Sequence, residues 1–233
     1  MRSLFVTGTD TEAGKTFATA GIVRGFVCSG INAVPAKPVQ TGCVNGIAED
    51  LEFSLKTAGL SFSDAVKDKL CPLQFVPACS PHLAAELAGT PIDLARMVAG
   101  LEKLRSDFEC VVAEGAGGIF VPLGYGKTML DLMVALDWPV VLVSSDKLGT
   151  INHTLLSISA LQNAGLDVAG IIINHASPPS KLISESNTSA ILEYGGVRIL
   201  GEIPFSPNSF PDHSFAAICK ILKGILSDEL PGN

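Results

Sequence analysis

The chain of 233 residues carries 47% hydrophobic and 17% charged residues, and its formal net charge is −7. This composition predicts a folded protein with a sizeable core and excludes a disordered chain. The acidic balance excludes a basic surface over the whole domain, so we expect neither nucleic acid nor a membrane as a partner.

Short apolar runs alternate with amphipathic stretches along the chain, which is typical of alternating strands and helices. The predicted strands are Ser3–Thr7, Ala33–Lys37, Glu109–Ala113, Pro139–Ser144, Val168–Ile173 and Val197–Leu200. The predicted helices are Lys15–Ser29, Glu49–Ala58, Pro81–Ala88, Asp93–Arg105, Thr150–Asn163, Ser180–Tyr194 and Ser214–Leu226. Between the second strand and the second helix, Pro38–Ala48 is predicted to be a loop.

Several predicted strands are apolar at every position, as expected when helices cover both faces of a parallel sheet. The alternation therefore predicts an α/β fold, with a doubly wound, mainly parallel sheet and helices on both faces. We find no internal repeat or linker and interpret residues 1–233 as one domain. Ligands of such sheets bind at the carboxyl ends of the strands, so the loops that follow the strands are the places to search for a site.

The cysteine pattern and the apolar stretches indicate where the protein resides. The six cysteines form no CxxC pair and no cluster with the four histidines. Free thiols in a reducing compartment are therefore favoured over disulfides or a zinc site. The N-terminus lacks the apolar core of a signal peptide, and no apolar stretch approaches the roughly 20 residues of a membrane helix. We expect a soluble, cytoplasmic protein.

The segment GTDTEAGKT, Gly8–Thr16, follows the first predicted strand and opens the first predicted helix. This is the context of a phosphate-binding P-loop, in which glycine lets the backbone approach phosphates and the helix start supplies N–H donors. Lys15 is expected to reach the β- and γ-phosphates of a nucleotide, and the Thr16 hydroxyl to bind Mg²⁺. Because Gly8 lies six positions before Gly14, where the usual pattern has five, the P-loop is a modified one.

Three charged side chains lie at or near the same edge of the predicted sheet. Glu114 opens the run Glu114–Gly118 after a predicted strand, which suits a second Mg²⁺ contact; the alternative is a glycine-rich turn with a solvated glutamate. Asp50 could also bind Mg²⁺, or it could simply be a residue that the positive end of the helix dipole favours at a helix N-terminus. Lys37 ends an apolar strand, where it could stabilise an anion beside the γ-phosphate or extend to solvent.

Two further segments are ambiguous. Asn174 follows a predicted strand and could present its amide to a base or ribose, although spacing alone favours a turn-forming asparagine. The run Lys147–His153 opens a predicted helix, whose N–H groups could hold a carboxylate, or Thr150 could cap that helix. The histidines look structural or exposed, because none has a partner at metal-ligand spacing.

The motifs GTDTEAGKT, KPVQTG, SPHLAAE, VVAEGAGG, KLGTINHT, Asn174 and GEIP together resemble the dethiobiotin synthetase family. They occur in this order from the first strand to residue 204. The resemblance implies a P-loop NTPase-like fold and a homodimeric, ATP- and Mg²⁺-dependent ligase of biotin biosynthesis. In that family, CO₂ and an amine of 7,8-diaminononanoate form a carbamate, ATP phosphorylates the carbamate, and the second amine closes the ureido ring.

The resemblance also implies a role for each motif. Lys15 and Lys37 match the catalytic cations, and Thr16, Asp50 and Glu114 match the Mg²⁺ ligands. The implied nucleotide contacts are Glu12, Ala13, Gly14, Lys15, Thr16, Phe17, Asp50, Glu114, Gly115, Ala116, Gly117, Asn174, His175, Ile203, Pro204 and Phe205. The implied substrate contacts are Thr11, Lys37, Thr41 and Gly118, together with Gly149, Thr150, Ile151 and Asn152 of the other subunit, so that the dimer shares its active sites.

The chain departs from the family pattern at Ala13, where valine is usual, at Thr41, where serine is frequent, and at His175, where aspartate or a small polar residue is common. A regulatory ATPase of the ParA or MinD type is the alternative, but such proteins usually carry an additional lysine where this chain has Asp10. A related amidotransferase synthetase would require a glutaminase segment, and we find none before the chain ends near residue 233.

Overall fold

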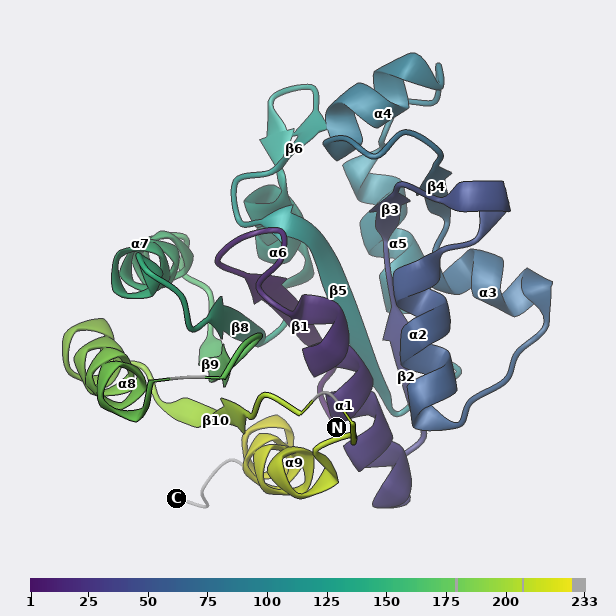
Figure 1. Ribbon diagram of the computed structural model, residues 1–233. Helices are drawn as coiled ribbons and strands as arrows, with labels where there is room; N and C mark the ends of the chain where they lie inside the picture. The colour runs from purple at the N-terminus through teal and green to yellow at the C-terminus, as the bar shows by residue number, and fades with distance from the viewer. Residues whose placement is uncertain (179, 207, 228–233) are drawn as a thin grey trace, which may run out of the picture.

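The computed structural model describes residues 1–178, 180–206 and 208–227. Its centre is a six-stranded sheet with the spatial order β10-β9-β8-β1-β5-β2 (Figure 1). All neighbouring strands of this sheet are parallel, which confirms the predicted α/β class. The strands are β1 (Leu4–Gly8), β2 (Ala33–Ala36), β5 (Cys110–Gly118), β8 (Val140–Ser145), β9 (Val168–Asn174) and β10 (Ile199–Ile203).

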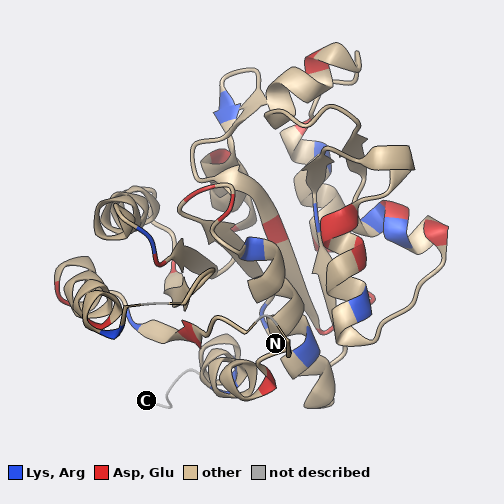
Figure 2. Cartoon of the chain, in the orientation of Figure 1, with Lys and Arg blue, Asp and Glu red and all other residues tan. Residues whose placement is uncertain are grey.

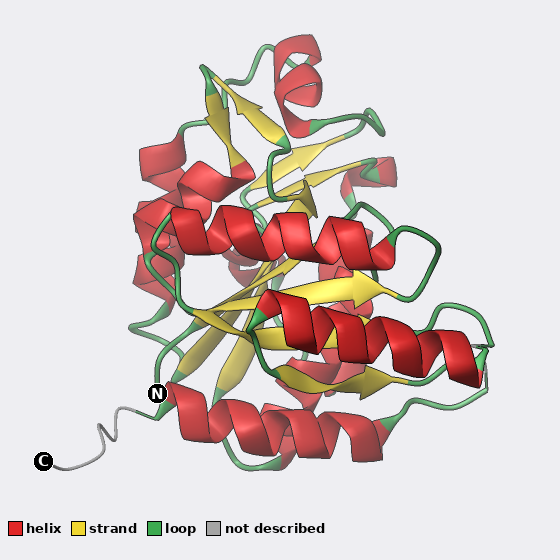
Figure 3. Ribbon diagram, turned by 90° about the vertical axis from the view of Figure 1, so that its left-hand side faces the viewer, coloured by secondary structure: helices red, strands yellow, loops and turns green. Residues whose placement is uncertain are grey.

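Helices cover both faces of the sheet (Figure 3). One face carries α1 (Lys15–Cys28) and α9 (Asp212–Leu226), and the other carries α5 (Leu94–Leu104), α6 (Met129–Leu136), α7 (Thr150–Asn163) and α8 (Lys181–Gly195). Successive strand side chains point to opposite faces, so Leu4 and Val6 of β1 join the α1 core cluster while Phe5 joins the α5 and α6 cluster. Helix α2 (Glu49–Ala58) packs beside α1 at the β2 edge.

The order of the strands reverses next to β1. From β1 the chain crosses to β2, later inserts β5 between them, and then builds β8, β9 and β10 on the other side of β1. Loops that leave the carboxyl ends of neighbouring strands therefore diverge at β1 and leave a crevice there. The loop from β1 to α1 lies at this crevice, which places the predicted P-loop at the expected binding edge.

Some expected boundaries were wrong. The predicted loop Pro38–Ala48 contains β3 (Val39–Thr41) and a short 3-10 helix (Val44–Gly46), and β3 pairs with β4 (Leu73–Phe75). The run Glu114–Gly118 does not follow a strand but forms the second half of β5. The last strand lies at Ile199–Ile203 rather than Val197–Leu200, because Gly201 and Glu202 interrupt its apolar pattern.

Several short elements had no counterpart in the expected pattern. They are α3 (Asp64–Leu70), α6, β4 and the antiparallel pair β6 (Pro122–Gly124) and β7 (Lys127–Thr128). Segments of two to eight residues are too short to show a clear period, and α6 is apolar on nearly every side. Helix α4 occupies Pro81–Leu87, as expected. One domain over residues 1–233 stays a prediction.

Four of the six cysteines are buried. All six cysteines are free. Burial raises the pKa of the Cys110 and Cys219 thiols to about 12, which makes them unreactive at neutral pH. Within the described ranges, no helix combines the length and the apolar character that crossing a bilayer requires.

Helices α1 and α9 approach each other closely at Gly21 (α1). A Cβ atom at Gly21 would overlap the ring of Phe215, and one at Gly25 would lie 2.5 Å from the Cys219 sulfur. The Phe215 ring is fully enclosed, so it has little room to move away. The absence of a side chain at Gly21 is therefore a packing requirement of this helix pair.

We expect Gly21→Ala to lower the free energy of unfolding by about 1–3 kcal/mol, because overpacking outweighs the better helix propensity of alanine. Urea denaturation measures the change. The matched control is Gly100→Ala in α5, where nothing lies within 4 Å of the new Cβ. That control should gain about 0.5–1 kcal/mol. Equal stabilisation by both substitutions would contradict the close contact.

Candidate active site

The P-loop, residues 8–16, joins β1 to α1, and the backbone conformation of Gly14 lets the loop turn into α1. This residue is the N-cap of α1 and has φ +99°, a conformation that favours glycine. A Cβ atom here would also overlap the side-chain amide of Asn174. No side chain caps α1, so the N–H groups of its first turn are available to an anion.

The Lys15 side chain folds back over the P-loop. Its Nζ donates to the carbonyl oxygens of Asp10 and Thr11 at 2.9 and 3.0 Å. Burial, together with the nearby charge of Lys37, lowers the pKa of Lys15 to about 8. Phosphate oxygens would favour the charged form of this lysine, so the free P-loop holds a cation whose charge a phosphate would stabilise.

Lys37, Glu114, Asp50 and Thr16 converge beside the P-loop and form what we call the Lys37 cluster. Lys37 Nζ lies 2.6 Å from Glu114 Oε1 and 2.7 Å from Asp50 Oδ2. The Thr16 hydroxyl donates to the same Glu114 oxygen at 2.8 Å. Figure 2 shows the basic start of α1 close to acidic segments of β5 and α2. Residues from four separate segments thus meet at one point.

The electrostatics of the cluster favour a charged Lys37. Burial by itself would lower its pKa, but Glu114 and Asp50 outweigh that effect and raise the pKa of Lys37 above its usual value. Lys37 is only 4% exposed and Glu114 only 2%. The alternatives of a lysine extending to solvent and of a solvated glutamate are therefore wrong.

The predicted Mg²⁺ ligands fit a hard cation. Thr16, Asp50 and Glu114 offer hydroxyl and carboxylate oxygens, which Mg²⁺ prefers, and two of these residues already contact a cation, the Lys37 ammonium. Among the described residues, no three His, Cys, Asp or Glu side chains gather into a metal site of their own. Proteins usually hold Mg²⁺ by one or two carboxylates together with substrate phosphates.

Sequence reasoning missed Gln40, which positions Asp50. Gln40 lies in β3 and is buried. With its amide turned so that the oxygen faces α2, it accepts from the backbone N–H groups of Glu49 and Asp50 at 3.0 and 3.1 Å. It therefore caps α2, whose N-cap residue Ala48 provides no side-chain acceptor. The sequence feature that could have indicated this role is a polar residue directly after the apolar Val39, in a segment that follows a predicted strand.

The end of β5 runs alongside the P-loop. The carbonyl oxygens of Gly8 and Thr9 lie 3.7 Å from the Cβ position of Gly118, and Thr11 Oγ1 lies 3.7 Å from that of Gly117. The structure thus brings Gly117 and Gly118 against the P-loop, with Thr11 beside Gly117. Thr41 ends β3, one residue beyond Gln40.

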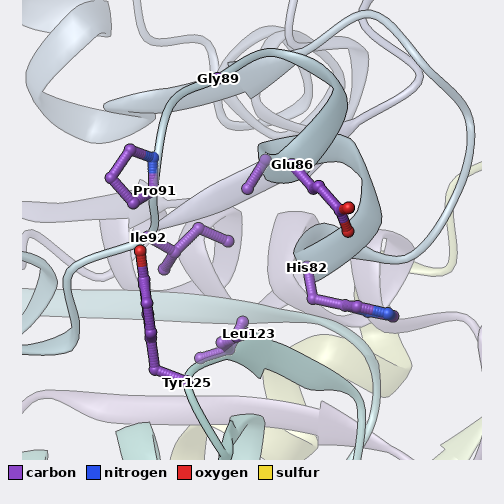
Figure 4. A pocket seen from close by; sticks show the side chains of 9 residues that line it. His82, Glu86, Gly89, Pro91, Ile92, Leu123 and Tyr125 are labelled. Atoms are coloured by element: carbon purple, nitrogen blue, oxygen red, sulfur yellow. The ribbon is translucent and has the colours of Figure 1, made fainter.

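Two hollows flank the P-loop. One, of about 580 Å³, is lined by P-loop residues with Phe17, Glu49, Asp50 and Phe53. The other, of about 530 Å³, lies between Thr9–Thr11, the segment 118–122 and Leu156 of α7. A further cavity of about 500 Å³ lies between α4 and β6, with Tyr125 and Glu86 at its wall (Figure 4), and contains none of the predicted site residues.

Phe17 lies at the start of α1 within an aromatic group. Its ring centroid is 4.9 Å from that of Phe210 and 6.1 Å from that of Phe53. Phe17 and Phe53 also line the hollow that contains the end of the P-loop.

Asn174 lies against the P-loop from the β9 side. Its side chain is buried, and Nδ2 donates to the Ala13 carbonyl at 3.0 Å, so it is not a turn-forming asparagine. Ile203 of β10 pairs in register with Asn174. The segment Ile203–Phe205 therefore begins beside Asn174. The neighbouring His175 side chain is buried between two carboxylates.

Helix α7 begins on the same side of the P-loop. Its N-cap is Gly149, with φ +91°, and no side chain caps it. Thr150 is the first helical residue, and its hydroxyl lies 2.9 Å from that of Ser144, so Thr150 as the cap was wrong. Lys147 Nζ lies 3.1 Å from Asp10 Oδ2 and ties the start of α7 to the P-loop.

Comparison with known proteins places the chain among curated relatives. A family model described as an AAA domain matches residues 2–212. The chain is 36% identical over 229 residues to the ATP-dependent dethiobiotin synthetase of Halalkalibacterium halodurans, covering 98% of this chain and 93% of that protein. It is 40% identical over 210 residues to the synthetase of Anaeromyxobacter dehalogenans strain 2CP-1, covering 89% and 92%.

Solved structures of other proteins share the architecture. The MinD cell division protein of Aquifex aeolicus matches with a TM-score of 0.63 and 14% identity, over 100% of both chains. A ParA family ATPase of Chlorobium tepidum matches with a TM-score of 0.55 and 13% identity, over 96% of this chain and 93% of that one. At these identities the likeness shows the P-loop NTPase fold alone.

We expect MgATP binding at about pH 8.5 to be accompanied by proton uptake, because Lys15 is then largely neutral in the free protein and phosphate oxygens stabilise its charged form. Calorimetry in buffers of different ionisation enthalpy measures the uptake. At about pH 6.5, Lys15 is charged before binding, so its contribution should vanish. Equal uptake at both pH values, or none at the higher one, would contradict the lowered pKa.

Proposed function

The chain belongs to the family of ATP-dependent dethiobiotin synthetases, ligases of biotin biosynthesis, and from this premise we propose that it converts 7,8-diaminononanoate, CO₂ and ATP into dethiobiotin, ADP and phosphate. The observation that carries this proposal is the buried Lys37 ammonium, which lies beside the P-loop and pairs with Glu114 and Asp50. A P-loop alone would suit any nucleotide-binding protein. A second buried cation next to it suits an anionic acceptor of the γ-phosphate.

The proposed reaction has three steps. One amine of the diamine attacks CO₂ and loses a proton, which gives a carbamate. A carbamate oxygen then attacks the γ-phosphorus, and ADP leaves, which gives a carbamic-phosphoric anhydride. The second amine attacks the carbamoyl carbon and loses a proton, phosphate leaves, and the ureido ring closes.

The charges of the site suit the second step. A carbamate anion must approach a polyanion, so this step needs cations more than it needs a general base. We assign Lys15 to the β- and γ-phosphates, because it folds over the P-loop. We assign Lys37 to the carbamate and to the charge that develops during phosphoryl transfer. When bound, Mg²⁺ neutralises phosphate charge, and Thr16, Asp50 and Glu114 are the residues that would hold it.

The hollow beside α7 supports a substrate with an alkyl chain. Apolar side chains of Ile119, Val121 and Leu156 line it, and Thr11 and Gly118 line its P-loop end. Burial of methylene groups against such walls is favourable, at about 0.8 kcal/mol for each. We therefore place the amines of the diamine near Thr11, Thr41 and Lys37, with the chain running towards α7.

We further propose a twofold dimer in which the substrate carboxylate binds the start of α7, residues 149–152, of the second subunit. The uncapped N–H groups and the dipole of a helix start suit a carboxylate. Exposed apolar side chains surround this region: Leu148 is fully exposed, and Phe120 and Leu156 are more than half exposed. Such surface is typical of an interface between subunits.

A regulatory ATPase is the second candidate, because MinD and ParA proteins share the fold. Against it stands Asp10, which occupies the place of the additional lysine expected in those proteins. The Asp10 carboxylate pairs with Lys147. We therefore favour the synthetase.

The deciding experiment measures phosphate release with bicarbonate and ATP, in the presence and absence of the diamine, and identifies the product by mass spectrometry. We expect phosphate and dethiobiotin only when the diamine is present. Lys37→Ala should lower the rate by about a hundredfold or more, because a preorganised cation is lost. Lys127→Ala, at an exposed lysine, is the matched control. Phosphate release that does not depend on the diamine would favour a plain ATPase.

Glu114→Gln should raise the Mg²⁺ concentration needed for half-maximal rate, because it removes a ligand charge and keeps the shape of the side chain. A Mg²⁺ titration of the steady-state rate checks this. Glu109→Gln, just before the opposite end of β5, is the control. An unchanged titration for Glu114→Gln would leave Glu114 only its structural contacts with Lys37 and Thr16.

The shared site can be tested by complementation. We expect Lys37→Ala chains and chains with Gly149→Pro and Asn152→Ala to be inactive separately. In a mixed dimer, one site combines the intact Lys37 of one chain with the intact α7 start of the other. Activity should return to about a quarter of the wild-type level per total chain if pairing is random. Mixed dimers that are verified by mass spectrometry and remain inactive would contradict the shared site.

A further inference from the structure

The His175 ring lies between two carboxylates that the proposed reaction does not use. Its Nδ1 is 3.0 Å from Asp146 Oδ2, and its Nε2 is 2.9 Å from Glu202 Oε2. The side chain of His175 is 4% exposed and that of Asp146 is 7% exposed, whereas Glu202 is 47% exposed. Each ring nitrogen thus lies within hydrogen-bond distance of a carboxylate oxygen, and the two contacts together fix the orientation of the ring.

These three residues join the ends of three strands, and we call them the His175 network. Asp146 directly follows β8, His175 directly follows β9, and Glu202 lies in β10. Helix α8 adds Asn187, whose Nδ2 donates to Asp146 Oδ1 at 2.9 Å. Backbone bonds run in parallel, from Asp146 N to the Asn174 carbonyl and from His175 N to the Ile203 carbonyl. The network therefore sets how these strand ends lie relative to one another.

The network is one residue away from two contacts with the P-loop. Asn174, which precedes His175, donates to the Ala13 carbonyl at 3.0 Å. Lys147, which follows Asp146, pairs with Asp10 at 3.1 Å. A shift of the His175 ring would move its own backbone and, through it, the Asn174 side chain and the adjoining segment 203–205.

We propose that His175 is a positioning residue for the nucleotide. By holding Asp146 and Glu202 together, it keeps Asn174 and the Ile203–Phe205 segment where the base and ribose bind, and its ring does not itself contact the nucleotide. This inference rests on the proposed use of ATP at the P-loop. It replaces the implied direct contact of His175 with an indirect role, because the ring atoms that could bind a ligand are already paired.

A positioning role and a purely structural role of His175 predict different effects on ligand binding. Phosphate groups would bind the uncapped N–H groups at the start of α1, whereas the network joins the ends of β8, β9 and β10. The network should therefore matter for the nucleoside and not for the phosphates. Loss of the ring should therefore weaken ATP binding but leave the affinity for inorganic tripolyphosphate unchanged. A histidine that only stabilises the fold would lower the melting temperature and leave both affinities alone.

The test compares wild-type protein with His175→Gln by calorimetry, using MgATP and tripolyphosphate as separate probes. We expect the Kd for MgATP to rise about tenfold, the Kd for tripolyphosphate to change less than about twofold, and kcat at saturating ATP to stay within about twofold. His82→Gln, at an exposed histidine of α4, is the matched control and should bind both probes as the wild type does.

A second variant tests the proposal if His175→Gln does not fold because the buried Asp146 carboxylate has lost its histidine partner. His175→Leu combined with Asp146→Leu removes both partners and leaves no unpaired carboxylate in the interior. It should fold and still bind MgATP weakly. If either variant binds MgATP with wild-type affinity, or loses affinity for both probes equally, the positioning role is wrong. If the wild-type protein itself fails to bind MgATP, the proposed function fails instead.

Discussion

The Lys37 ammonium lies in the interior and depends on the carboxylates around it. Removing a charge from water is expensive, and a buried ion pair that loses one partner destabilises a protein by about 3–5 kcal/mol. Glu114 and Asp50 provide the compensating charges, at 2.6 and 2.7 Å from Lys37 Nζ. The end of β2, the middle of β5 and the start of α2 therefore stabilise one another where they meet.

This constraint explains features that look unrelated along the chain. β5 pairs Ala113 with Ala36 of β2, so Glu114 and Lys37, one residue further along each segment, come to lie side by side. Gln40 caps α2 and holds Asp50 at the cluster. Thr16 donates to the shared Glu114 oxygen and so connects the cluster to the P-loop. The two ion pairs of Lys37 and the Thr16 hydrogen bond thus link the β2 edge of the sheet to the P-loop.

The P-loop is supported from both sides. On the β5 side, Thr16 connects it to the Lys37 cluster, and on the β9 side, Asn174 and Lys147 contact Ala13 and Asp10. The molecule has a net charge of −7, yet this edge of the sheet gathers two buried lysines and an uncapped helix start. A local arrangement of charges and dipoles, and not the net charge, makes an anion site. The fold is shared with MinD, whereas the charges gathered at this edge come from this chain's own residues.

The sequence by itself determined the alternation of strands and helices, the P-loop and the identity of most charged residues of the candidate site. These are local features: an apolar run, a glycine spacing or a lysine at a strand end can be read from neighbouring residues. The motifs that occur between the first strand and residue 204 extended this to the family, because their order along the sequence carries information that no single motif has.

Only the tertiary structure decided which charges pair. Lys37 meets Glu114 across 77 positions of sequence, and His175 meets Asp146 across 29. It also decided that Thr150 packs on Ser144 and does not cap α7, that Gln40 caps α2, and that the last strand begins at Ile199. Sequence patterns report neighbours along the chain, whereas burial and pairing depend on segments that meet only when the sheet forms. For that reason the sequence determined the parts of the site, and the packed structure determined their contacts.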